Sequence, residues 1–62
     1  MHFYCYPDAA GEVRWRLVAG NGRTLADSGE GYKRYASALH AMNLIAGNQS
    51  IPIRFAPGFR PA

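Results

Sequence analysis

Hydrophobic and polar residues alternate one by one over residues 13–19, which is the pattern of a strand with one buried face. The apolar face holds Val13, Trp15, Leu17 and Ala19, and the opposite face holds Arg14, Arg16 and Val18. Because successive side chains of a strand point to opposite faces, we expect the Trp15 indole to lie in the core. The arginines on either side of it then face outward.

Two further strands flank this one along the chain. Residues 2–6 are short and aromatic and end at Pro7, which predicts a strand followed by a turn. Asn21-Gly22 favours a two-residue type I′ hairpin, which requires positive φ at both residues, and a third strand then ends near Ser28. The predicted register sets Ala19 opposite Thr24, Leu17 opposite Ala26, Arg16 opposite Asp27, Tyr4 opposite Arg16 and Tyr6 opposite Arg14. Arg16 thereby gains a cross-strand carboxylate.

One amphipathic helix is predicted from Lys33 to Ala46, and Gly47 is a favourable residue to end it. Its apolar residues recur every three or four positions, as one face of a helix requires. They are Tyr35, Ala38, Leu39, Met42, Ile45 and Ala46. This stripe and the apolar face of residues 13–19 are expected to bury each other.

A short fourth strand is indicated by the alternating apolar residues Ile51, Ile53 and Phe55. Pro52 cannot donate a ladder hydrogen bond, so it marks the start or an edge of that strand. The strand can return to its own sheet or add to the sheet of a second copy. The tail, residues 57–62, is rich in proline and glycine and is predicted to be flexible.

The element order is therefore β-β-β-α-β, and the predicted fold class is α+β. We expect a two-layer unit in which an antiparallel sheet packs on one helix. A single domain over residues 1–56 accounts for the whole pattern.

A second subunit is expected because the chain is small. A domain of 62 residues buries only about 60% of its unfolded surface, and such domains often need a staple, a metal or a partner. Cys5 is the only cysteine, and with His2 and His40 it supplies too few ligands for structural zinc. Exchange of an identical element is a low-cost route to a dimer. We therefore predict a homodimer that swaps its C-terminal strand, with the interface at Ile51, Ile53 and Phe55.

Neither a catalytic centre nor a membrane segment is predicted. Cys5 is expected to face the helix, where thiols are generally inert, and the histidines and acids form no nucleophile–base–acid arrangement. No apolar run approaches the roughly 18 residues of a membrane span. The N-terminus lacks signal-peptide features, and one free cysteine suits a reducing compartment. The sequence thus predicts a cytoplasmic protein without enzymatic activity, cofactor or metal.

The chain carries a net charge of +3, which is compatible with nucleic acid or another anionic partner. The face opposite the helix is expected to hold Tyr4, Tyr6, Arg14 and Arg16. Aromatic rings interleaved with arginines can bind single-stranded nucleic acid, but they can equally form cation–π pairs on a solvated surface. Lys33 and Arg34 add a candidate anion site at the helix N-terminus, where the glycines that precede them are more simply explained as tight turns.

Several segments, in their order and spacing, carry a resemblance to a known family. They are Phe3-Tyr4-Cys5-Tyr6, Arg14-Trp15-Arg16-Leu17, Asn21-Gly22, Gly29-Glu30-Gly31-Tyr32 and the Ala36-Ser37-Ala38 helix start. Over about residues 2–46 the chain resembles the YegP-like family of small bacterial and archaeal domains of unknown function. The resemblance implies a β-β-β-α-β unit that, in single-unit members, forms homodimers with a continuous sheet and exchanged C-terminal strands. It implies no activity, cofactor or catalytic residue.

The function predicted from the sequence is a small homodimeric structural or interaction module without catalytic activity. The alternative is a weak binder of nucleic acid or another anion that uses the face of arginines and tyrosines.

Overall fold

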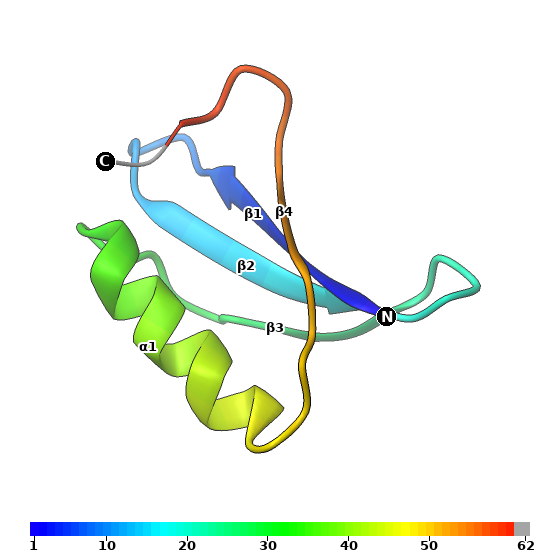
Figure 1. The fold of residues 1–62 in the computed structure, drawn as a ribbon. Helices are drawn as coiled ribbons and strands as arrows, with labels where there is room; N and C mark the ends of the chain where they lie inside the picture. Colours follow the sequence, from blue (N-terminus) through cyan, green and yellow to red (C-terminus); the bar gives the residue numbers. More distant parts are fainter. Residues whose placement is uncertain (61–62) are drawn as a thin grey trace.

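The computed structural model describes residues 1–60, which form one sheet covered on one side by one helix (Figure 1). The strands are β1 (His2–Pro7), β2 (Val13–Val18), β3 (Thr24–Asp27) and β4 (Ile53–Phe55), and the helix is α1 (Tyr35–Ala46). The four strands lie in the order β3-β2-β1-β4. The predicted α+β class, element order and packing of a sheet on a helix are confirmed.

β4 lies parallel to β1, so the sheet is mixed and the prediction of an antiparallel sheet is wrong. β1 and β3 both run antiparallel to β2, so β3 and β1 point the same way. A parallel strand needs a long crossover connection, and α1 supplies it between β3 and β4. The Phe3 N–H donates to the carbonyl oxygen of Pro52, and the Ala56 N–H donates to that of Cys5, both at 2.9 Å. Pro52 thus serves as an acceptor at the start of the strand. In this single chain β4 pairs with β1 of the same copy.

The loop between β2 and β3 is longer than predicted. The Ala19 N–H donates to the carbonyl oxygen of Arg23 at 2.8 Å, which leaves residues 20–22 as the loop. Gly22 has a φ of 87°, whereas no residue other than glycine has positive φ among those described. Asn21 is therefore not left-handed, and the predicted type I′ turn is wrong. A three-residue loop with a left-handed glycine is the next most common hairpin connection.

A register irregularity between Leu17 and Val18 restores the predicted pairing further along the hairpin. Val18 pairs with Thr24, so the predicted pair of Ala19 and Thr24 is wrong. The pairs Leu17–Ala26 and Arg16–Asp27 are confirmed. Because the side-chain period of a strand is two, this recovery keeps the two faces of β3 in step with those of β2.

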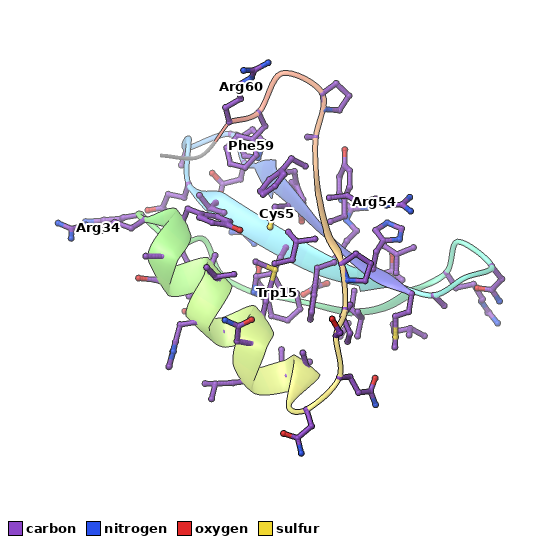
Figure 2. The ribbon with its side chains drawn as sticks, viewed as in Figure 1. Cys5, Trp15, Arg34, Arg54, Phe59 and Arg60 are labelled. Atoms are coloured by element: carbon purple, nitrogen blue, oxygen red, sulfur yellow. The ribbon has the colours of Figure 1, made fainter. Side chains whose placement is uncertain are left out.

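The core lies between the sheet and α1 (Figure 2). Its buried members are Phe3, Cys5, Val13, Trp15, Ala38 and Met42. The Phe3 and Trp15 rings meet edge to face, with centroids 5.5 Å apart, which is a favourable aromatic geometry. The Cys5 thiol donates to Met42 Sδ at 3.7 Å, so strand and helix meet through their sulfur atoms.

The helix begins at Tyr35 rather than Lys33, with Arg34 in extended conformation before it. It ends at Ala46 as predicted, and the Gly47 N–H donates to the carbonyl oxygen of Asn43. Ile45, which was expected in the core, is 49% exposed. Ile45 lies three residues after Met42, which is about 300° of helix rotation. Its side chain therefore points to one side of the helix face that Met42 and Ala46 turn toward the core.

The Gly29-Glu30-Gly31-Tyr32 segment closes the start of β2. Tyr32 exchanges two backbone hydrogen bonds with Val13, of 2.7 and 2.8 Å. Gly31 lies so close to the turn before β2 that an added Cβ would stand 2.8 Å from the Asp8 carboxylate. The motif therefore has a structural reason, since only glycine allows this approach.

The tail predicted to be flexible covers residues 57–62, of which 61 and 62 lie outside the described residues. The Phe59 N–H donates to the carbonyl oxygen of Ala56 at 2.9 Å. The half-buried Phe59 ring packs against the core cluster. Its centroid lies 6.3 Å from that of Phe55.

Candidate nucleic-acid interface

The face of the sheet opposite α1 carries the tyrosines and arginines that the alternation assigned to it. The register pairs Tyr4 with Arg16 and Tyr6 with Arg14, as predicted. All four side chains are half-buried. We refer to the side of the sheet away from α1, which carries these four residues, as the open face.

The two tyrosines and Arg16 form one contact group. The rings of Tyr4 and Tyr6 are stacked, with centroids 6.0 Å apart and an angle of 26° between their planes. The guanidinium carbon of Arg16 lies 4.6 Å from the Tyr6 centroid and 5.7 Å from the Tyr4 centroid. These distances are those of cation–π contacts, so Arg16 is held over both rings.

Arg14 has a different role, because it is paired with Asp8. Its Nε donates to Asp8 Oδ2 at 2.8 Å, while Asp8 Oδ1 accepts the N–H groups of Ala10 and Glu12 at 2.9 Å. The hydrogen bond from Arg14 is the main cause that lowers the pKa of Asp8, followed by the backbone bond from Glu12. Arg14 thus fixes the turn between β1 and β2, and most of its charge is offset.

Arg16 does not form an ion pair with Asp27, although the register places the two residues opposite each other. Among residues 1–60 the ion pair present is that of Arg14 with Asp8. Asp27 Oδ1 instead accepts the Gly29 N–H at 2.9 Å. The expected cross-strand carboxylate is therefore used by the turn after β3, and Arg16 rests on the tyrosines.

Arg54 belongs to the same face and was missed by the sequence analysis. It is exposed, it pairs with Tyr4 in the parallel register of β4 and β1, and its side chain points away from α1 (Figure 2). A row thus crosses the sheet from β4 to β3 through Arg54, Tyr4, Arg16 and Asp27. The alternation of Ile53 and Phe55 indicated that Arg54 faces away from the helix, but it did not indicate which strand lies beside it.

Lys33 and Arg34 lie elsewhere, so the structure does not bring all predicted basic residues together. They line a pocket of about 440 Å³ at the start of α1, together with Gly11, Val13, Tyr35, Ala36 and Phe59. The first turn of the helix holds no acidic residue, and Arg34 makes no side-chain capping bond. Arg34 and Arg54 point to opposite sides of the molecule in Figure 2.

The residues predicted for the dimer interface are partly covered within the single chain. Ile51 and Ile53 are half-buried and pack against the core cluster. Phe55 remains 41% exposed, with its ring centroid 5.7 Å from that of Tyr35 and 6.3 Å from that of Phe59. Leu44 of α1 is 70% exposed. Apolar surface therefore remains available on β4 and α1.

Cys5 lies in the core, as predicted. It is fully buried beneath α1, and burial raises the pKa of its thiol to about 11. Within residues 1–60 no group of three or more histidine, cysteine, aspartate or glutamate side chains is placed to hold a metal ion. The described part of the chain also contains no helix with the length and apolarity needed to cross a membrane.

The fold and its open face define a small α+β domain that presents stacked tyrosines and arginines on an uncovered sheet. A family model described as a domain of unknown function (DUF1508) matches residues 8–51, and the chain belongs to this family. The resemblance to YegP-like domains agrees with this membership.

Two relatives are similar over most of their length. UPF0339 protein Atu0232 of Agrobacterium fabrum is 50% identical over 48 residues, covering 77% of this chain and 76% of the relative. UPF0339 protein NMB1088 of Neisseria meningitidis serogroup B is 47% identical over 45 residues, covering 73% of this chain and 79% of the relative. No solved structure matches the chain.

Proposed function

We propose that this chain is a non-catalytic interaction module that works in the cytoplasm as a homodimer, with β4 exchanged between the two copies. The observation that carries the proposal is the apolar surface left around β4 and the second half of α1. Phe55 is 41% exposed beside the rings of Tyr35 and Phe59, and at the other end of α1 Leu44 and Ile45 are 70% and 49% exposed. A contiguous apolar patch that stays exposed is typical of interaction sites. The buried, protonated Cys5 thiol supports a role other than catalysis, since the thiolate is the nucleophilic form.

Exchange of β4 is favoured by how the strand is attached. β4 is a short edge strand, and residues 47–52 connect it to α1 without regular structure. The hydrogen bonds that β4 makes with β1 are the same whether the strand comes from its own copy or from another. An exchanged element therefore keeps all its native contacts, which makes this route to a dimer low in cost.

We expect light scattering on the full chain to report twice the 6.8 kDa mass of one copy, because each copy takes its β4 from the other. The variant Phe55→Cys tests whether β4 is exchanged. Cys5 and Phe55 are partners across β1 and β4, and paired positions on neighbouring strands are close enough for a disulfide. After oxidation during refolding, exchange predicts a covalent dimer on a non-reducing gel. A stable monomer, or a disulfide formed only within one copy, would contradict the proposal.

A second candidate function is binding of an anionic ligand, with nucleic acid as the leading class, to the open face. The specific observation is that Arg16 has no carboxylate partner within residues 1–60 and lies over two tyrosine rings. A cation beside flat aromatic surfaces matches the two parts of a nucleotide, its phosphate and its base. Lys33 and Arg34 are proposed only as a weaker, separate contact for anions at the helix N-terminus.

We expect the tyrosine resonances of Tyr4 and Tyr6 to shift in NMR spectra when an oligonucleotide is added at low salt. The shifts should disappear as salt is raised, because contacts to phosphates are lost with increasing ionic strength. The resonances of Tyr32, which pairs with the start of β2, serve as an internal control and should stay in place. Unchanged Tyr4 and Tyr6 resonances at low salt would contradict this second function.

A further inference from the structure

We propose that Arg54 completes a binding site for single-stranded nucleic acid, in which the strand lies across β4, β1 and β2 over the row Arg54–Tyr4–Arg16. This inference rests on the second candidate function and assigns to it a ligand class, a direction and an additional residue. It is carried by the parallel register of β4 on β1, which sets Arg54 directly beside Tyr4.

The row places a ring between two cations. Tyr4 pairs with Arg54 on one side and with Arg16 on the other. Neighbouring strands are about 4.7–4.9 Å apart, so long arginine side chains can reach from either side to groups that flank the Tyr4 ring. A base stacked on the Tyr4 ring would then have Arg54 near the phosphate on one side of the base and Arg16 near the phosphate on the other.

The free positive charge of the open face lies at Arg16 and Arg54. Neither forms an ion pair within the described residues, whereas Arg14 is held by Asp8. His2 lies near the same edge, and its pKa is lowered by burial, then by Arg54 and by the N-terminal amine. This positive edge matches a polyanion, and successive phosphates beside Arg16 and Arg54 would offset two charges that the domain leaves unpaired.

The rings select single-stranded nucleic acid over other polyanions. Tyr4 and Tyr6 are stacked at 6.0 Å on an uncovered sheet, and aromatic residues on a four-stranded sheet can stack two or three bases. In a duplex the base faces are hidden within the stack, and an acidic protein segment has no flat aromatic groups to match. Stacking also tolerates any base, so little sequence preference is expected.

The test of this site compares Arg54→Gln with Arg23→Gln in binding to a fluorescent oligothymidylate at low salt. Both arginines are exposed, and each variant removes one positive charge, but Arg23 lies at the loop between β2 and β3. We expect Arg54→Gln to weaken binding about five- to tenfold and to reduce the salt slope by about 0.7, the value of one phosphate contact on a single strand. Arg23→Gln should stay within about twofold of the wild type, and Tyr4→Leu should weaken binding about tenfold through lost stacking.

Equal weakening by Arg54→Gln and Arg23→Gln, with intact wild-type binding, would overturn the role of Arg54 and leave the second candidate function standing. Equally tight binding of a duplex of the same length would overturn the assignment to single strands. No binding of any oligonucleotide by the wild type at low salt would overturn both this inference and the function on which it rests. Thermal unfolding followed by circular dichroism checks that each variant is folded.

Discussion

Removal of all residues after Gly47 is expected to leave material that is unfolded or aggregated. The deletion removes the acceptor of the Phe3 N–H and the donor to the Cys5 carbonyl, at the edge of β1 that β4 covers. It also removes Ile51, Ile53 and Phe59, which pack against the core cluster. Small domains have a stability of only about 5 kcal/mol at the low end, so this loss is expected to exceed it. A bare β1 edge then invites pairing with other chains.

Circular dichroism and sedimentation of the truncated chain measure this effect. The matched test is addition of a peptide covering residues 48–60, which supplies β4 and Phe59 as a separate molecule. We expect the peptide to restore the helical and sheet signal, because β4 makes the same contacts whatever chain it belongs to. A truncated chain that melts cooperatively and stays soluble without the peptide would show that β4 is dispensable, and the dimer proposal would lose its basis.

Phe3→Ala is expected to destabilise the domain by about 3–5 kcal/mol, the usual cost of removing a buried aromatic ring. Phe3 is 1% exposed and packs edge to face on Trp15, so the substitution opens a cavity at the centre of the core. This loss is comparable to the whole stability expected of a domain of 62 residues. We therefore expect most of the variant to be unfolded at room temperature.

The fluorescence of Trp15, the only tryptophan in the chain, reports this unfolding in a denaturant titration. The control is Leu25→Ala on β3, where the side chain is 57% exposed, and surface substitutions of this kind usually change stability by less than about 0.5 kcal/mol. Similar midpoints for Phe3→Ala and the wild type would contradict the assignment of Phe3 to the core.

The strands and the helix followed from local patterns. The alternation of apolar residues over 13–19 and their helical spacing over 35–46 both reflect which side of an element meets the core. Each pattern is contained within a short segment of the sequence. The loop at residues 20–22 differs from the predicted two-residue turn for a local reason as well. A glycine on each side of Asn21 fits a three-residue loop with a left-handed glycine as readily as the two-residue turn.

The candidate site was only partly predictable. Tyr4, Tyr6, Arg14 and Arg16 were assigned to one face because strand alternation requires it. The pairing of Arg14 with Asp8 was not foreseen, since it depends on how the turn after β1 folds back on itself. Arg16 was expected beside the Asp27 carboxylate, but Asp27 bonds the backbone of its own turn instead. These outcomes depend on competition between hydrogen-bond and ion-pair partners of similar strength. The spacing of residues in the sequence does not show which partner is preferred.

The sequence by itself determined the order of the elements, the residues on each face of β1 and β2, and the end of α1 at Ala46, before Gly47. Those properties depend on side-chain periodicity and on backbone preferences of single residues. Only the tertiary structure decided that β4 lies parallel to β1, and hence that Arg54 joins Tyr4 and Arg16. The position of an edge strand is set by where the crossover helix can bury its apolar side on the sheet, which is a property of the packed layers as a whole.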